Sequence, residues 1–402
     1  MTTKFHRFIE KSSLILPFFQ GFAVNLCMDN PENSLEDLRY KIAISLVPGI
    51  GCITAKSLIA YCGSAGQVFR EREKVLRTIP GVGTVLAKNI QQSAVLKRAG
   101  REVEFMDKNG VSAHFYLDEE YPQRLKSCVD APILLFSKGT PNLNCAKVIS
   151  IVGTRNATEY GRELVDKFMM TLAERGYAIQ VVSGLAYGID IQAHRAALRN
   201  NLPTVCVLAH GLETVYPSLH KAIAMEMCEK GGGMVSDFLS YSTIDRKNFL
   251  RRNRIIAGMA DAVIVVESAR KGGALLTAEL ALSYNRDLFA FPGRVGETYT
   301  EGCHFLIKSN RAALIENVSD LEYCMNWQPG SGDPDVCQPR LFADLLPDEQ
   351  IVVDLLQKAG ETAIDSICHQ TGFPMSRVSS MLLSLEFSGI VKSLPGKVFR
   401  LM

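Results

Sequence analysis

Residues 148–190 decide the fold of this chain, and they read VISIVGTRNATEYGRELVDKFMMTLAERGYAIQVVSGLAYGID. Two short apolar runs, Val148–Val152 and Ala178–Val182, have the length and composition of buried strands. Between them, Arg162–Arg175 places its apolar residues on one face of a helix, and Gly176 ends that helix. A strand, a crossing helix and a second strand predict a βαβ unit with parallel strands.

The same alternation continues beyond this unit. Helical stretches separate further apolar runs, which occur at Thr204–Leu208, Met234–Val235, Ala262–Val266 and Leu288–Phe291. Two short extended segments, at 111–117 and 133–136, precede them. This spacing predicts an α/β fold, an extended Rossmann-like doubly wound sheet.

Different patterns flank the predicted sheet. At 402 residues, the chain is longer than one compact domain usually needs. The pattern is helical from Leu38 to Lys108, polar with Pro and Gly around 328–335, and then typical of three helices and a hairpin, which predict a winged helix. We therefore expect a tail or wrongly assigned start at 1–27, a helical helix-hairpin-helix (SAM-like) domain at 28–108, an extended Rossmann domain at 109–325, a linker at 326–346 and a winged helix at 347–402.

Two similar phrases punctuate the helical segment, VPGIG at 47–51 and IPGVG at 79–83. Each fits a helix, a tight glycine turn and a second helix, because glycine tolerates the positive φ of such a turn. The N–H groups that open the second helix can meet a phosphate. Because Lys56 and Lys88 are the only cations near the loops, DNA contact and simple helical packing both stay open.

The extreme N-terminus superficially resembles an export signal. Cations precede an apolar run from Leu14 to Cys27. The run is interrupted by Pro17 and polar residues, lacks a small-residue cleavage site and is too short to span a bilayer. We expect translation to start at Met28, with export as the alternative.

Composition narrows the function classes. Hydrophobic residues make up 47% and charged residues 21%, which predicts a folded core. The formal net charge is only +2, so a nucleic-acid partner needs a local basic patch. The eleven cysteines contain no CxxC pair, which fits reduced thiols in the cytoplasm. We expect no metal, no cofactor and no membrane contact.

The predicted winged helix is not basic. Its segment carries five cations and six acids, whereas a DNA-reading winged helix usually carries an excess of cations. A protein-contact or regulatory role is favoured there.

Glycine-rich polar phrases follow the predicted strands, where sheets of this class bind ligands. GTRN at 153–156 follows the first strand, SGLAYGID at 183–190 the second and HGLE at 210–213 the third. Glycines let the backbone approach an anion, and hydroxyls supply hydrogen-bond donors. The sequence lacks both GxGxxG and GxxxxGK[ST], so P-loop hydrolysis is not expected. The candidate residues here are Gly153, Thr154, Arg155, Ser183, Gly184 and Gly188.

The densest basic cluster is RKNFLRRNR at 246–254, with five cations in nine positions. Guanidinium groups grip phosphate, and an aromatic ring stacks on an unpaired base. The cluster directly precedes a predicted helix at Ile255, so we expect it near the same rim as Arg155, with a solvated loop as the alternative. A second glycine turn, KGG at 271–273, either holds a phosphate or only starts a helix. The candidate residues here are Phe249, Arg251, Arg252, Asn253, Arg254, Lys271, Gly272 and Gly273.

Together these phrases resemble the DprA/Smf family of DNA-processing proteins, from about Met28 to the C-terminus. This sequence differs from the usual family pattern at three positions: it has Leu250 instead of Pro, Ala209 instead of Gly and Glu213 instead of Asp. The matching phrases are YPQRL (121–125), IVGTRNATEYG (151–161), VVSGLAYGIDIQAH (181–194), GLETVYP (211–217), FLRRNRIIAG (249–258), GGALLTA (272–278) and FPG (291–293).

The resemblance implies a cytoplasmic homodimer without catalysis. Such a protein binds single-stranded DNA without sequence preference, protects incoming strands and loads RecA recombinase onto them during natural transformation. The resemblance also implies a shared phosphate pocket for Arg155, Arg251, Arg252 and Arg254, a weaker role for Lys221, and dimer or recombinase contacts along Gly302–Ile307, including His304, Phe305, Leu306 and Ile307.

Two alternatives remain from the sequence. The predicted sheet is distantly similar to phosphoribohydrolases of the LOG type, which cleave nucleoside monophosphates with a PGGxGTxxE phrase. KGGALLTAE at 271–279 contains paired glycines but lacks the Pro, and when Thr277 is aligned with the Thr of the phrase, Leu276 stands for the third Gly and Glu279 falls one residue early. A scaffold with a vestigial pocket is the second alternative.

Overall fold

The computed structural model describes residues 31–91, 93–328, 346–360, 362–387, 390–394 and 397–401. The chain divides into two compact units, Met1–Gly332 and Asp333–Met402. The expected tail at 1–27, with the start expected at Met28, and most of the expected linker lie outside the described residues. The remaining domain boundaries stay predictions.

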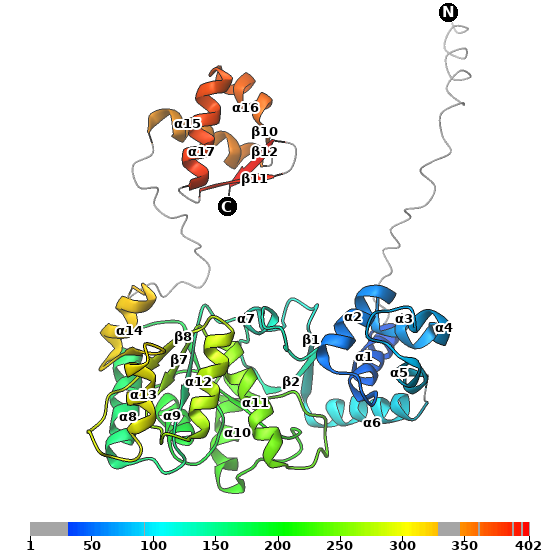
Figure 1. Ribbon diagram of the computed structural model, residues 1–402, viewed down its shortest axis with the longest axis vertical. Helices are drawn as coiled ribbons and strands as arrows, with labels where there is room; N and C mark the ends of the chain where they lie inside the picture. The colour runs from blue at the N-terminus through cyan, green and yellow to red at the C-terminus, as the bar shows by residue number, and fades with distance from the viewer. Residues whose placement is uncertain are drawn as a thin grey trace, which may run out of the picture. The chain divides into compact units, whose positions relative to one another are not determined.

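The first unit is built on one mixed sheet, which confirms the predicted α/β class (Figure 1). Its strands run in the spatial order β1-β2-β6-β5-β4-β3-β7-β8-β9. Neighbours from β6 to β9 are parallel, whereas β1 pairs antiparallel with β2, and β2 antiparallel with β6. The strands are β1 Val111–Phe115, β2 Leu134–Gly139, β3 Lys147–Val152, β4 Ile179–Ser183, β5 Thr204–Val207, β6 Gly233–Ser236, β7 Ala262–Val265, β8 Asp287–Ala290 and β9 Ala313–Leu314.

Strand β3 marks the point where the strand order reverses. Ser150 of β3 pairs with Val182 of β4 on one side and with Val263 of β7 on the other. The chain adds strands from β3 towards β6 and then returns to add β7, β8 and β9 on the opposite side. In an open α/β sheet, ligands bind beyond the carboxyl ends of the strands at this reversal.

Helices cover both faces of the sheet (Figure 1). Side chains alternate along β3: Val148 and Val152 pack in one core with α11 and α12, whereas Ile149 and Ile151 pack in another core with α8 and α9. The helices are α7 Gln123–Lys126, α8 Glu159–Glu174, α9 Ile189–Arg199, α10 Lys221–Glu229, α11 Arg246–Met259, α12 Gly273–Ser283, α13 Glu301–Lys308 and α14 Val318–Met325, with the 3-10 turn η1 Ser218–His220 before α10.

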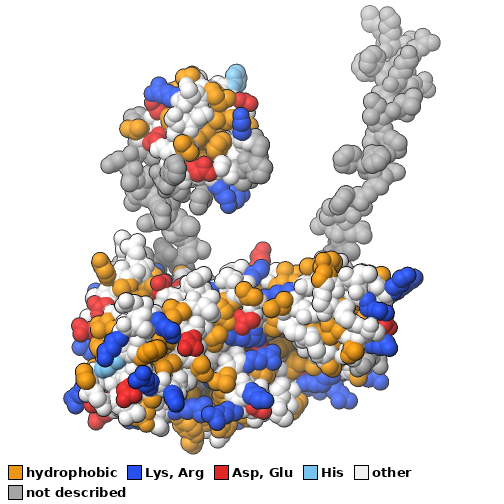
Figure 2. All heavy atoms as spheres, viewed as in Figure 1, with side chains coloured by type: hydrophobic (Ala, Val, Ile, Leu, Met, Phe, Trp, Pro, Cys, Tyr) orange, Lys and Arg blue, Asp and Glu red, His pale blue; other side chains and the backbone are white. Residues whose placement is uncertain are grey.

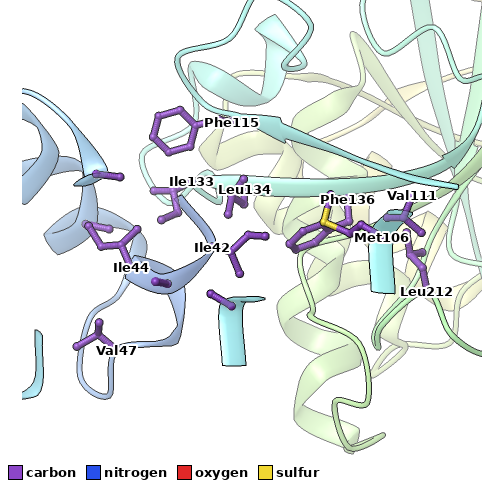
Figure 3. Packing of buried hydrophobic residues seen from close by; sticks show 14 of the residues in the cluster. Ile42, Ile44, Val47, Met106, Val111, Phe115, Ile133, Leu134, Phe136 and Leu212 are labelled. Carbon is purple, nitrogen blue, oxygen red and sulfur yellow. The ribbon is translucent and has the colours of Figure 1, made fainter. Parts of the chain in front are cut away.

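A helical module packs against the β1–β2 edge of the sheet. Figure 3 shows Ile42 of this module close to Leu134 of β2, and Ile42, Ile44, Leu134 and Phe136 belong to one buried apolar cluster. The tight turns at Gly49 and Gly81 have φ of +87° and +83°, the conformation expected of the two glycine phrases. The helices are α1 Pro31–Leu46, α2 Cys52–Cys62, α3 Ala65–Arg70, α4 Glu73–Leu76, α5 Thr84–Ile90 and α6 Ser93–Asn109.

The second unit is the predicted winged helix. Its three strands are antiparallel in the order β10-β12-β11. The elements are α15 Pro347–Ala359, β10 Thr362–Ala363, α16 Ile364–Thr371, α17 Met375–Phe387, β11 Val391–Leu394 and β12 Val398–Leu401. Across the described ranges of the whole chain, no helix combines the length and apolar character needed to span a bilayer.

Candidate nucleic-acid interface

A pocket of about 680 Å³ opens at the reversal point of the sheet. Its wall combines the loop after β3, the segment after β7 and one side of α11. Figure 2 shows Lys and Arg side chains gathered on the visible face around α10 and α11. The candidate residues that line the pocket are Gly153, Thr154, Arg155, Phe249, Arg252, Asn253, Gly272 and Gly273.

Glycines hold the loop after β3 in place. Gly188, the N-cap of α9, has φ of +80°, and a Cβ there would lie 2.2 Å from the Thr154 carbonyl oxygen. The Ile189 N–H donates to that same oxygen at 3.1 Å. A Cβ on Gly153 would lie 2.5 Å from Ile189. The start of α9 therefore presses on the loop and fixes the backbone that carries Arg155.

Arg155 is exposed and lies above an aromatic pair. Its guanidinium carbon is 5.7 Å from the centre of the Phe249 ring, and Phe249 meets Tyr216 edge-on at 6.0 Å. A guanidinium above a ring is held by the negative face of the ring while its N–H groups stay free for an anion. This group offers a phosphate donor beside surfaces that can stack on a base.

Arg252 lies beneath the pocket and is only 3% exposed. Its Nη1 donates to the Val207 carbonyl at 3.1 Å. A Cβ on Gly184 would lie 1.7 Å from that Nη1 and 2.6 Å from an Asp190 carboxylate oxygen, so Gly184 leaves room for both side chains. Burial raises the pKa of Asp190, and the charge of Arg252 opposes the rise. Arg252 is thus a fixed positive charge in the floor of the pocket.

The basic cluster is helical, which corrects the expectation that it precedes the helix. The Asp245 side chain caps α11 by accepting from the Lys247 N–H at 2.8 Å. With 3.6 residues per turn, the arginines then diverge. Arg252 lines the pocket, whereas Arg251 and Arg254 point to the other side of α11 and meet Asp237 at 3.4 and 2.6 Å. The expectation that all three share a pocket with Arg155 is therefore wrong for Arg251 and Arg254.

The second glycine turn lies at the pocket, although its lysine does not line it. Gly272 is the N-cap of α12, and a Cβ there would lie 2.4 Å from the Ser268 Oγ. Gly273 has open space on its Cβ side. The position of this turn, at the pocket and at the start of α12, fits both a phosphate contact and a helix start. Lys271 is exposed and is not among the lining residues.

Several other candidates lie away from the pocket. Ser183 is buried and its hydroxyl donates to the Ile151 carbonyl at 2.6 Å, which is a structural role. Lys221 is exposed at the first position of α10 and does not line the pocket. Glu279, the carboxylate that the phosphoribohydrolase reading needs, is exposed on α12 at 3.8 Å from Arg311.

The expected contact strip lies on α13, and its residues differ in exposure. Leu306 is 1% exposed and belongs to the core, so it cannot reach a partner in this fold, which corrects its assignment. Phe305 is 40% exposed, with Arg311 above its ring. Ile307 is half-buried, and His304 is half-buried with its Nε2 at 2.9 Å from the Gly293 carbonyl oxygen.

The pocket also contains residues that the sequence reasoning did not select. Arg246 and Tyr216 line it, and both fall inside the sequence phrases quoted above. Helical periodicity would have found Arg246, because it lies three residues before Phe249 and seven before Asn253, which both line the pocket. Asp190 could be identified as a pocket residue only from the folded structure, where it approaches Gly184. Within the described ranges, no group of three or more His, Cys, Asp or Glu side chains could hold a metal ion.

A mostly parallel α/β sheet with a cationic, aromatic pocket at its reversal point defines an extended Rossmann-type binding protein, here with a winged helix appended. Residues 112–326 match the family described as DNA recombination-mediator protein A, and residues 338–397 match the DprA winged helix domain. The chain belongs to the DprA/Smf family.

Individual relatives agree with this assignment. The chain is 33% identical to Protein Smf of Escherichia coli over 325 residues, which cover 77% of this chain and 86% of that protein. It is 36% identical to DNA processing protein DprA of Streptococcus pneumoniae over 205 residues, 51% of this chain and 71% of that one. The X-ray structure of DprA from Streptococcus pneumoniae superposes with a TM-score of 0.58 at 30% identity, covering 71% of this chain and 97% of that one.

Proposed function

We propose that this protein binds single-stranded DNA without sequence preference through the pocket at the reversal point, and that it protects incoming strands. The observation that carries this proposal is the stack of Arg155 on Phe249 beside Tyr216, above the buried charge of Arg252. Stacking serves any base, and guanidinium groups grip the backbone, so neither contact reads sequence. Relatives named DNA processing proteins support a DNA ligand.

The two candidate carboxylates, Glu279 and Asp190, are poorly placed for catalysis on a nucleotide. Glu279 is exposed outside the pocket, whereas Asp190 lines the pocket but is only 8% exposed, with its carboxylate held by Arg252 and by backbone hydrogen bonds from Ala186 and Gly184. A general acid or base has to reach its proton through a hydrogen bond. The proposal therefore includes no catalysis, and release of free base from AMP by the purified protein would contradict that part.

The test is a fluorescence-anisotropy titration of labelled oligo-dT at two salt concentrations, with duplex DNA as competitor. We expect tight binding that salt weakens and duplex does not displace. Arg155→Ala should weaken binding to every sequence alike, whereas Arg199→Ala, at the last position of α9 and outside the pocket, is the matched control. Wild-type protein that fails to bind, or equal affinities of the two variants, would defeat the proposal.

We further propose RecA loading in natural transformation, a homodimer formed through the Rossmann domain and a cytoplasmic location. Phe305 on α13 is the exposed apolar side chain that supports a protein contact there. Sedimentation of wild-type protein and Phe305→Asp would test the dimer, and RecA filament assembly on strands coated with single-strand-binding protein would test loading.

A further inference from the structure

A second cavity of about 730 Å³ lies on the other side of α11, between the helical module and helices α11 and α12. Its wall includes Ile50–Thr54 of the first glycine hairpin and its following helix, together with Leu250, Arg251 and Arg254 of α11. Ser45, Asp130 and Leu280 are the other lining residues. Leu250 is the one described residue in the linings of both this cavity and the proposed pocket.

The cavity wall carries more positive charge than its acids balance. The Nη2 atoms of Arg251 and Arg254 lie 3.4 and 2.6 Å from the same oxygen of Asp237, so two guanidinium groups share one carboxylate. Arg254 is 7% exposed, and its buried Nε has no hydrogen-bond partner among the described residues. The Arg251 side chain is 55% exposed and able to reach a ligand.

The flanking groups keep the balance positive. Burial lowers the pKa of Lys56 on α2, and the charge of Arg254 lowers it further, while Cys52 and Asp130 oppose the change. Asp130, the acid in the wall, accepts a hydrogen bond from the Tyr284 hydroxyl at 2.6 Å. In the wall itself, Arg251 and Arg254 lie with Asp130 and share Asp237 behind them, and Lys56, outside the lining but close to Arg254 and Asp130, adds the one positive charge in excess.

The glycine hairpin adds backbone donors to the same wall. Helix α2 begins after Gly51, and no side chain caps its first turn. The free N–H groups of an uncapped helix start, together with the helix dipole, favour an anion. The equivalent helix start after Gly83, at the second hairpin, is likewise uncapped, but Gly83, Thr84 and Val85 are not among the residues that line this cavity. The first hairpin is therefore the one that lines this cavity beside Arg251 and Arg254.

Leu250 connects the two cavities. Its side chain is 50% exposed, and it lines both the pocket and the second cavity. Resting on the proposed function, we propose that a strand leaving the pocket passes over Leu250 and places a further backbone phosphate in the second cavity. Arg251 and the start of α2 hold this phosphate, and a neighbouring base lies against the exposed side chains of Ile53 and Leu250.

The test compares two lengths of labelled oligo-dT on the full chain, about 4 and about 16 nucleotides. Arg251→Gln and Ile53→Asp should each weaken binding of the longer strand about fivefold, with a salt slope shallower by about 0.7 for each phosphate that the protein no longer binds. The shorter strand, which fills the pocket alone, should keep its affinity.

Each variant has a matched control. Lys247→Gln removes a cation from an exposed position of the same helix, outside both cavity walls. Val85→Asp adds the same charge as Ile53→Asp at the equivalent, 75% exposed position of the second hairpin. All four positions lie on the surface, and urea unfolding would verify that the fold is intact.

The outcomes separate the two proposals. Selective loss of affinity for the longer strand supports the second cavity. If the test variants bind the longer strand as their controls do, or if Arg251→Gln weakens both lengths equally, the strand does not continue there and only the pocket stands. If wild-type protein binds neither length, the proposed function fails, and the second cavity fails with it.

Discussion

Gly184→Ala should damage both stability and DNA binding, although it adds a single methyl group. The new Cβ would lie 1.7 Å from the Nη1 of Arg252, and ordinary contacts begin at 3.4 Å, so the guanidinium has to retreat by about 1.7 Å. That movement breaks its 3.1 Å hydrogen bond to Val207. Loss of a charged hydrogen bond costs about 1.5–3 kcal/mol, and forced repacking of a filled core costs about 1–3 kcal/mol. Because both terms describe the same displacement, we expect a loss of roughly 2–4 kcal/mol.

Urea unfolding and oligo-dT anisotropy measure the two effects. Gly100→Ala is the control: Gly100 lies inside α6, its nearest Cβ contact is an ordinary 3.7 Å, and alanine there should stabilise the helix by about 0.5–1 kcal/mol. An unfolding free energy of Gly184→Ala within about 0.5 kcal/mol of wild type, with unchanged affinity for DNA, would refute the close approach of Arg252 to this backbone.

Other variants probe separate features. His194 is fully buried, and burial first, with Arg252 next, lowers its pKa from 6.5 to about 3. Between pH 6.5 and pH 3, His194 is therefore protonated in the unfolded chain but neutral in the folded one. The free energy of unfolding should fall by about 2 kcal/mol from pH 6.5 to pH 5, and urea titrations of His194→Gln should show a weaker dependence on pH. Glu102 is 2% exposed and accepts hydrogen bonds from the Ser240 N–H at 2.8 Å and hydroxyl at 2.6 Å, so Glu102→Gln should cost about 1–3 kcal/mol by the same method; an unchanged unfolding free energy would contradict this anchoring role. Gly188→Ala meets both a positive φ and a backbone oxygen at 2.2 Å, so it should destabilise the protein more than Gly184→Ala, as thermal melts would test.

The six central strands were predictable because they are buried on both faces and read as continuous apolar runs. The β1–β2 edge of the sheet was harder to predict. The sequence indicated extended segments at 111–117 and 133–136, but the antiparallel pairing of β1 with β2, and of β2 with β6, depends on contacts between residues distant in the chain. The glycine turns of the helical module were also predictable, since Gly49 and Gly81 adopt the positive φ expected of their two phrases.

The site was only partly predictable. The sequence located Arg155 and Arg252 near one another, but it placed the basic cluster before a helix instead of inside it. That error hid the periodicity that separates Arg252 from Arg251 and Arg254. The partner of the latter two, Asp237, follows β6 and comes close only in the folded chain.

The helical module is not a detachable part, because Ile42 and Ile44 share a core with Leu134 and Phe136. A gene fragment starting at Val111 would uncover that apolar surface beside β1, the edge strand of the sheet. Exposed apolar edges recruit other chains, so such a fragment is expected to aggregate. Recombination between relatives should consequently inherit residues 31–328 as one block.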